Sequence, residues 1–283
     1  MKIELNKLSE VKGIGKKTIQ RIREYKLTDE GYISEYDKSL HLNRNSVNQG
    51  DCLELMNGIK DKSIDMILAD LPYGTTACNW DSIINLDKLW LQYERVIKDN
   101  GAIVLTASQP FTTKLINSNI GIFKYGWVWE KNAGSNFGCM DYQPMKEHED
   151  ILIFGKGKTK YNPIMEDRKG AGKNRVKYNV NYNTNAEVYR DSSLKNKKTS
   201  KRPNKRYPSS IQKFNRERGL HPTQKPVALF EYLIKTYTNE GDLVLDNVAG
   251  SGTTGAACQN TNRDYILIEQ EVEYVDVIRD RLS

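Results

Sequence analysis

An aspartate, a proline and a tyrosine stand together just after an apolar run, residues 64–68, that is typical of a buried strand. The Asp70 carboxylate can accept a hydrogen bond from an NH2 group, and the carbonyl of Leu71, held by the ring of Pro72, can accept a second. Tyr73 can stack on the face of a planar ring. Two acceptors beside one amine orient its lone pair, so the turn predicts catalysis by positioning on a planar, amine-bearing substrate. The alternative is a simple turn in which Asp70 caps a helix.

A second turn, DNVAGSGTTG, begins at Asp246 after another short apolar run. Gly250 and Gly252 let the backbone pass close to a ligand because they carry no Cβ. Glu269 lies 23 residues after Asp246, at the end of the next predicted strand, where a carboxylate can bind both hydroxyls of a ribose. This pairing favours a ribose-bearing ligand over a bare strand-to-helix connection. A phosphate loop is disfavoured because no Gly-Lys-Ser or Gly-Lys-Thr follows the glycines.

Short apolar runs alternate with helical patterns around both turns. The pattern predicts strands over 63–70, 101–108, 127–132, 149–157, 242–250 and 264–270, and helices over 86–99, 227–238 and 253–260. This alternation predicts βαβ units and an α/β fold with a largely parallel sheet. In such sheets ligands bind beyond the carboxyl ends of the strands, which is where both turns lie. Trp127 and Trp129 fall within a predicted strand and are expected in the core.

Positive charge is concentrated in one segment of the chain. Residues 156–219 contain 19 Lys/Arg and 5 Asp/Glu, a net charge of +14, whereas the whole chain of 283 residues carries +7. The segment is rich in Asn and Tyr and poor in aliphatic residues, so it interrupts the α/β pattern as an insert. A basic block in an otherwise acidic protein indicates a surface that faces a polyanion. A solvated insert with no binding role is the alternative.

Composition argues against several classes of protein. No run approaches the roughly 18 apolar residues of a membrane span, and residues 1–17 lack the apolar core of a signal peptide. The four cysteines, Cys52, Cys78, Cys139 and Cys258, form no Cys-x-x-Cys pair, which argues against a zinc site and for reduced thiols. We therefore expect a cytoplasmic protein without a metal site. Heavy use of Asn and Lys hints at an AT-rich bacterial or phage genome.

The segment LSEVKGIGKKTIQRIREY, residues 8–25, resembles a helix-hairpin-helix. Gly13 and Gly15 would expose backbone N–H groups at a helix start, where a phosphate oxygen can bind, and Lys16 and Lys17 would add positive charge. Such a module positions DNA without reading its sequence. A structural helical hairpin or a dimer contact explains the same residues equally well.

The two turns belong to a longer ordered signature. The tetrapeptide Asp-Leu-Pro-Tyr is followed by HPTQKP at 221–226, by Gly-Asp at 241–242 and by AGSGTT at 249–254. Over residues 46–283 this order resembles the β group of DNA amino-methyltransferases, in which the catalytic tetrapeptide precedes the cofactor loop. The resemblance implies a Rossmann-like methyltransferase fold, S-adenosylmethionine as cofactor, and methylation of a base flipped out of double-stranded DNA.

The resemblance also implies roles for individual residues. Asp70, Leu71, Pro72 and Tyr73 would hold the flipped base. The cofactor site would comprise Asp51, Thr223, Gln224, Lys225, Asp246, Ala249, Gly250, Gly252, Thr253 and Glu269. In that site Asp246 would lie at the methionine end, Glu269 at the ribose and Asp51 near the adenine. Residues 223–225 would close over the cofactor.

Four segments follow from this comparison. They are a helix-hairpin-helix-like segment at 1–40, the catalytic half of the core at 41–155, a target recognition insert at 156–219 and the cofactor-binding half at 220–283. Within the insert, Arg202, Lys205 and Arg206 are candidate DNA contacts. The chain departs from the family at Leu71, where a proline is usual, and at 247–248, where Asn-Val replaces Pro-Phe.

Aspartate at the start of the tetrapeptide is typical of adenine-N6 enzymes in this family, and serine of cytosine-N4 enzymes. Asp70 therefore favours adenine, with cytosine-N4 as the alternative. An RNA methyltransferase, a protein-glutamine methyltransferase and a non-catalytic DNA-binding protein that kept the fold are less favoured readings. The sequence leaves open a homodimer and a cognate restriction nuclease as further partners.

Neutralising the Lys and Arg residues of segment 156–219 should weaken duplex binding and flatten its dependence on salt. With fewer contacts to phosphates, binding releases fewer counterions from the DNA. Binding constants measured by fluorescence anisotropy from low to high salt would test this. An unchanged slope would show that the charge is merely solvated.

Overall fold

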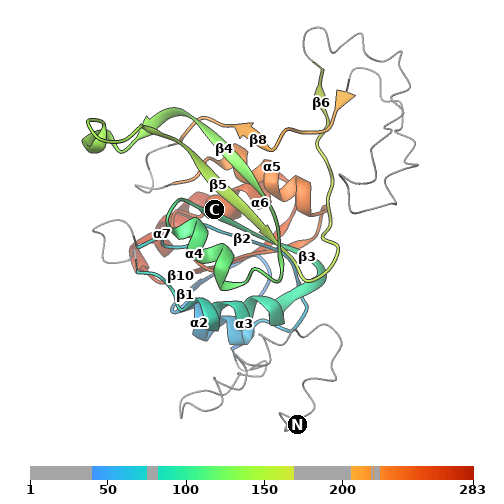
Figure 1. The fold of residues 1–283 in the computed structure, drawn as a ribbon. Helices are drawn as coiled ribbons and strands as arrows, with labels where there is room; N and C mark the ends of the chain where they lie inside the picture. The colour runs from blue at the N-terminus through green and yellow to red at the C-terminus, as the bar shows by residue number, and fades with distance from the viewer. Residues whose placement is uncertain (1–39, 75–81, 169–204, 218, 220–223) are drawn as a thin grey trace. The chain divides into compact units, whose positions relative to one another are not determined.

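A computed structural model of the chain describes residues 40–74, 82–168, 205–217, 219 and 224–283 (Figure 1). The helix-hairpin-helix prediction at the N-terminus falls outside these residues, as do Thr223 and Arg202. The described residues divide into two compact units. The larger unit runs to Asn162 and resumes at Ser210, and the smaller lies within 163–209.

A mixed sheet forms the centre of the larger unit. In the described part of the chain it contains β1 (Ser46–Gln49), β2 (Ile64–Ala69), β3 (Ile97–Ala107), β4 (Phe123–Ser135), β5 (Lys146–Phe154), β8 (Ile211–Lys213), β9 (Leu243–Asp246) and β10 (Asp264–Glu269). The strand order is β1-β10-β9-β2-β3-β5-β4-β8. The first five strands in this order are parallel, and β5 runs antiparallel to both of its neighbours. The predicted α/β fold with a largely parallel sheet is confirmed.

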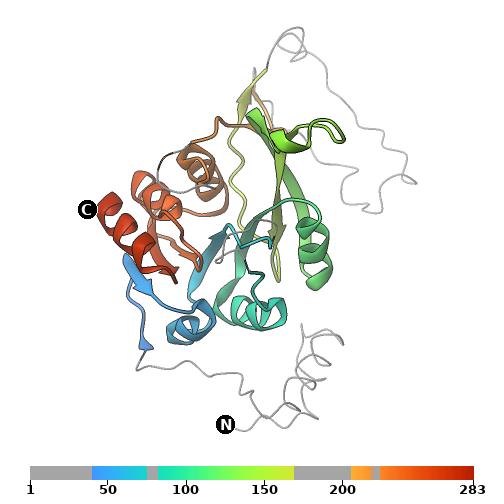
Figure 2. The same ribbon diagram turned by 90° about the vertical axis from the view of Figure 1, so that its left-hand side faces the viewer.

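Helices cover both faces of this sheet (Figures 1 and 2). One face carries α2 (Cys52–Leu55), with the 3-10 turn η3 (Met56–Gly58), α3 (Leu86–Val96) and α4 (Phe111–Ser118); the other carries α5 (Val227–Tyr237), α6 (Thr253–Asn260) and α7 (Val272–Leu282). Successive strand residues alternate between the two cores. In β2, for example, Ile67 packs toward α3 while Met66 and Leu68 pack toward α5. This explains why the strands read as continuous apolar runs.

The helix predicted over 86–99 ends at Val96, three residues early. The N–H of Ile97 still donates to the carbonyl of Tyr93, but Ile97 already pairs with Ile64 in the sheet. Its side chain is fully buried in the core. Pairing across the sheet therefore overrides the helical periodicity that the sequence shows at this boundary.

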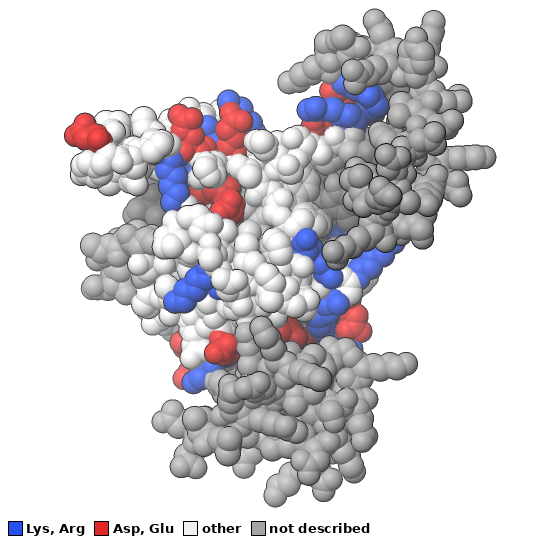
Figure 3. All heavy atoms as spheres, in the orientation of Figure 1, with Lys and Arg blue, Asp and Glu red and all other residues white. Residues whose placement is uncertain are grey.

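The smaller unit contains a short antiparallel pair, β6 (Glu166–Asp167) and β7 (Lys205–Arg206). Lys205 pairs with Asp167 at 2.6 Å, and Arg206 pairs with Glu166 at 2.6 Å. On the face shown in Figure 3, basic and acidic side chains of the described residues are interspersed. The smaller unit covers fewer residues than the predicted insert 156–219. The last residues of that insert include β8, which pairs with β4 and so belongs to the larger unit.

No helix in the described ranges is long and apolar enough to span a bilayer.

The 3-10 turn η4 (Phe137–Cys139) lies in the connection between β4 and β5.

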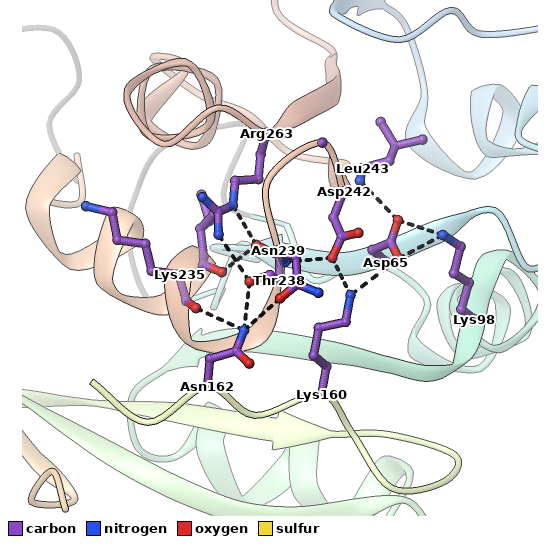
Figure 4. A network of polar contacts seen from close by, with 12 residues as sticks. Asp65, Lys98, Lys160, Asn162, Lys235, Thr238, Asn239, Asp242, Leu243 and Arg263 are labelled. Carbon is purple, nitrogen blue, oxygen red and sulfur yellow. Dashed lines mark hydrogen bonds and ion pairs between the residues drawn. The ribbon is translucent and has the colours of Figure 1, made fainter. Parts of the chain in front are cut away.

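A polar network ties the strands together at their amino ends (Figure 4). The buried carboxylate of Asp65 in β2 accepts two hydrogen bonds of 2.7 Å from Lys98 and one of 3.1 Å from the backbone N–H of Leu243. Lys160, after β5, contacts the carboxylates of both Asp65 and Asp242, and Asp242 directly precedes β9. The network thus joins β2, β3 and β9 at the edge of the sheet opposite their carboxyl ends.

Asp65→Ala should lower the free energy of unfolding by about 2–4 kcal/mol, because it strands a buried backbone N–H and removes the shared partner of two lysines. Urea denaturation followed by tryptophan fluorescence measures the loss. Asp99→Ala is the control, since Asp99 forms an exposed ion pair with Lys62 and should affect unfolding far less. Equal losses in the two variants would contradict the structural role of Asp65.

Candidate active site

Acidic side chains follow four neighbouring parallel strands of the sheet. Asp51 comes just after β1, Glu269 ends β10, Asp246 ends β9 and Asp70 follows β2. Because parallel strands end at one edge of a sheet, these residues converge there. All four line a single cavity of about 900 Å³.

The conformation of the glycine turn is fixed by hydrogen bonds to Glu269. The Gly250 N–H donates to Glu269 Oε2 at 2.7 Å, and the Glu271 N–H donates to Oε1 at 2.9 Å. Gly250 has φ +50°, a conformation that side chains with a Cβ rarely adopt. Burial raises the pKa of Glu269. The turn therefore places backbone without side-chain atoms beside a buried carboxyl group.

Asp246 is almost fully buried at the floor of the same cavity. Its Oδ2 accepts a hydrogen bond of 2.5 Å from the Thr254 hydroxyl, and its Oδ1 accepts one of 3.1 Å from the Val248 N–H. Burial, assisted by the negative charges of Asp70 and Glu269, raises the pKa of Asp246 to about 7. A carboxyl with this pKa is ready to ionise against a cation that enters the cavity.

Gly252 has a different place from the one predicted. It begins α6 with φ +77° and is not among the residues that line the cavity in the described part of the chain. A Cβ at Gly252 would lie 3.0 Å from the side chain of Ile278 in α7. The glycine therefore allows α6 and α7 to pack closely, and its role at the cofactor stays a prediction.

The departure from the family at 247–248 also has a visible consequence. Asn247 Oδ1 accepts a hydrogen bond of 2.5 Å from the buried Tyr93 hydroxyl in α3, which anchors the turn to the core. Val248 lines the cavity and packs against the hydrophobic core on the α3 side. Val248 thus supplies part of the apolar wall at the position where the family has phenylalanine.

The catalytic turn presents Asp70 to the same cavity. Asp70 Oδ1 accepts hydrogen bonds from the Tyr73 hydroxyl, at 2.8 Å, and from the Thr106 hydroxyl. Asp70 Oδ2 accepts one of 2.5 Å from Lys225. The Tyr73 ring stacks on Phe111 with centroids 5.2 Å apart. Burial and the charge of Asp70 raise the pKa of Tyr73, so its phenol stays neutral and keeps donating.

Three further charged residues stand beside the catalytic turn. Lys225 was expected to close over the cofactor, yet its ammonium contacts Asp70 and Glu149. Glu149 and Lys131 were assigned no role from the sequence, and both line the cavity. The sequence carries no clear signal for them, because Lys131 in β4 and Glu149 in β5 each lie inside a strand beside other charged residues. Trp129 is buried as expected, but it lines the cavity as well.

The cavity collects most of the predicted site residues that the structure describes. Those that line it are Asp51, Asp70, Leu71, Pro72, Tyr73, Gln224, Lys225, Asp246, Ala249, Gly250, Thr253 and Glu269. Lys205 and Arg206 lie in the smaller unit. Gly13, Gly15, Lys16, Lys17, Arg202 and Thr223 fall outside the described residues.

The donor set at the glycine turn fits S-adenosylmethionine. Two buried carboxylates, Asp246 and Glu269, suit a cationic ligand that also carries ribose hydroxyls, whereas a phosphate would meet two negative groups. The small residues Ala249, Gly250 and Ser251 leave room for close approach to the backbone.

Comparison with known proteins gives the family. A family model for DNA methylases, covering N6 and N4 enzymes, matches residues 64–280. The chain belongs to this DNA methylase family. It is therefore an S-adenosylmethionine-dependent DNA amino-methyltransferase with a Rossmann-like fold, as the ordered motifs implied.

Individual relatives support the assignment over most of the chain. The type II methyltransferase M2.MboI of Moraxella bovis is 30% identical over 277 residues, covering 88% of this chain and 90% of its own length. M.HpaI of Haemophilus parainfluenzae is 29% identical over 248 residues, covering 82% and 72%.

Solved structures show the same architecture. The M1.HpyAVI–SAM complex aligns with a TM-score of 0.55 at 25% identity, covering 84% of this chain and 98% of the other. The cytosine-N4-specific PvuII DNA methyltransferase aligns with a TM-score of 0.59 at 16% identity, covering 86% and 88%, and shows the shared fold alone.

The affinity for S-adenosylmethionine should rise about tenfold between pH 6 and pH 8. A carboxyl with a pKa near 7 goes from roughly a tenth to nine tenths ionised over that range, and the ionised form attracts the ammonium at the methionine end. Isothermal titration calorimetry of the wild type and of Asp246→Asn measures the effect. The variant should bind more weakly and show only the ligand's own titration. Parallel pH curves for the two proteins would place the ammonium elsewhere.

Proposed function

We propose that this DNA methylase is a site-specific adenine-N6 methyltransferase that acts on double-stranded DNA. The observation that carries the proposal is the position of Asp70. This carboxylate follows β2, the strand next to β9, and lines one cavity together with Asp246 and Glu269 at the cofactor turn. A target amine bound at Asp70 would therefore meet a methyl donor bound at the turn within the same enclosed space.

The residues of the cavity divide the work between base and cofactor. When bound, S-adenosylmethionine supplies an electrophilic methyl group on its sulfonium. Asp70 and the Leu71 carbonyl would accept the two amine hydrogens, which directs the nitrogen lone pair at the methyl carbon. Tyr73 would contact the base face, while Asp246 and Glu269 hold the ammonium and ribose ends. The methyl group would pass from sulfur to nitrogen with the cofactor leaving as a neutral thioether, and the proton that the nitrogen loses would leave along its hydrogen bond to Asp70.

Support for adenine comes from the tetrapeptide itself. Asp70 stands where the resemblance places aspartate in adenine-N6 enzymes and serine in cytosine-N4 enzymes. Its carboxylate reaches the cavity already fixed by Tyr73, Thr106 and Lys225. A fixed carboxylate is a stronger and better oriented acceptor than a serine hydroxyl, which suits the amine of adenine.

Support for a duplex substrate comes from the relatives, which are named type II methyltransferases. A base inside a duplex cannot reach an enclosed cavity, so the target must be extruded from the stack. The basic segment 156–219, with Arg202, Lys205 and Arg206, and the N-terminal segment with Gly13, Gly15, Lys16 and Lys17 are our candidates for holding the backbone. Because its substrate is DNA, we place the enzyme in the bacterial cytoplasm, in a restriction-modification system. A homodimer and a cognate nuclease stay predictions.

Asp70→Ala should lower the rate of tritiated methyl transfer to duplex DNA by about 100-fold to 1,000-fold, the usual cost of losing one fixed polar contact to the reacting group. Retained binding of S-adenosylmethionine by calorimetry would show that the fold and the cofactor site are intact. Full activity of the variant would refute the catalytic role of Asp70.

The identity of the base is tested on the same product. Nuclease digestion of the methylated DNA and mass spectrometry of the nucleosides should give N6-methyladenine. N4-methylcytosine would overturn adenine while leaving the rest of the assignment in place.

A further inference from the structure

Four charged side chains of alternating sign converge beside the catalytic turn, and they come from four separate elements. Asp70 follows β2, Lys225 precedes α5, Glu149 belongs to β5 and Lys131 to β4. Lys225 Nζ lies 2.5 Å from Asp70 Oδ2 and 3.4 Å from Glu149 Oε2. Lys131 Nζ lies 2.5 Å from Glu149 Oε1. The result is an unbroken chain of ion pairs that ends at the catalytic carboxylate.

This chain of charges is largely withdrawn from water. The side chains of Lys225 and Lys131 are each 6% exposed, that of Glu149 is 13% exposed and that of Asp70 is 24% exposed. Desolvating charges is costly, and apolar residues of similar volume often give equal stability in such places. The arrangement is therefore poorly explained by stability alone. Its position on the cavity wall points to the reaction.

Hydrogen bonding on Asp70 shows what the arrangement does. A carboxylate offers about four acceptor sites, two on each oxygen. Two hydroxyls, those of Tyr73 and Thr106, take both sites of Oδ1, and Lys225 takes one site of Oδ2. One acceptor site remains on Oδ2. With three donors fixed in place, the direction of that site is fixed too.

We propose that Lys225 and Glu149 are positioning residues for methyl transfer. Lys225 fixes the Asp70 carboxylate so that its remaining acceptor site meets the target amine, and Glu149 holds Lys225 in place. This inference rests on the proposed role of Asp70 as the acceptor of the amine. It differs from the role that the resemblance gave Lys225, which was to close over the cofactor.

The surroundings of Lys225 agree with this role. Its ammonium also lies 5.7 Å from the centroid of the Tyr73 ring, so one group contacts both members of the base-binding turn. Burial would lower the pKa of Lys225, but Asp70 and Glu149 outweigh it and raise that pKa. Lys225 and Lys131 lower the pKa of Glu149 against the opposing effect of burial. Lys225 and Glu149 therefore both stay charged through the neutral pH range.

The first test replaces Lys225 by methionine, which keeps an unbranched side chain only one atom shorter and removes the charge. The turnover number with tritiated S-adenosylmethionine should fall about tenfold to a hundredfold, while the KM and Kd for the cofactor stay within about twofold. Lys225→Arg should recover most of the loss because it restores the cation. Glu149→Gln should show a smaller loss of turnover, and combining it with Lys225→Met should add little further loss.

Matched controls lie on α5, the helix that Lys225 precedes. Lys235 and Glu231 form an exposed ion pair of 3.4 Å outside the cavity, so Lys235→Met and Glu231→Gln should leave turnover unchanged. Unchanged turnover in Lys225→Met would overturn the proposal. A loss confined to the cofactor KM would overturn it as well, and would return Lys225 to the cofactor site.

A second readout does not depend on activity. In the full-length protein labelled with 15N-lysine, the Lys225 Nζ resonance should exchange slowly and shift in both Asp70→Asn and Glu149→Gln, and it should not shift in Glu231→Gln. If Lys225 gave the same resonance in all of these variants, the proposed contact would be wrong. Were the wild type to transfer no methyl group to DNA, the function assigned to Asp70 would fail, and this spectrum would still decide whether Lys225 holds that carboxylate.

Discussion

The parallel pairing of β2 with β9 is the constraint on which the active site depends. Met66 lies opposite Val244 and Ile67 opposite Leu245, which joins strands from the two distant halves of the sequence. Since both strands run in the same direction, the residues that follow them reach the same edge of the sheet. Asp70 and Asp246 line one cavity for this reason. The network around Asp65 holds the same two strands together at their other ends.

The cavity holds carboxyl groups in two different electrostatic environments. Asp246 and Glu269 carry raised pKa values because burial disfavours their ionised forms, whereas Asp70 is held by a buried lysine. The carboxyl groups at the glycine turn are therefore suited to a ligand with positive charge, whereas Asp70 is already paired with a cation. In the function proposed above, this difference would separate the cofactor from the target base within a cavity of about 900 Å³. The carboxylates come from one edge of the sheet, and Lys225 comes from the segment that precedes α5.

Much of the architecture could be predicted because short apolar runs mark the central strands and apolar residues recur at helical spacing in α5. The sequence predicted β2, β10, α5 and α6 nearly to their ends, and the order of motifs led to the correct family. The boundary at Ile97 was wrong, since a residue with a helical pattern gained more from pairing with Ile64. Gly252 is predicted to be part of the cofactor turn, and the structure adds that its lack of a Cβ allows α6 to pack closely on Ile278.

By itself, the sequence determined the chemistry-bearing turns, the fold class and the family, because these reside in short contiguous stretches and their order. Only the tertiary structure decided that Lys225, Glu149 and Lys131 meet at Asp70. The order of the strands in the sheet and the direction of each side chain decide such contacts. The spacing of residues within a short stretch of sequence predicts neither. Lys131 and Glu149 lie 18 residues apart on antiparallel strands, and Lys225 approaches from 155 residues beyond Asp70. The physical reason is that an ion pair depends on distance in space, whereas sequence patterns record only distance along the chain.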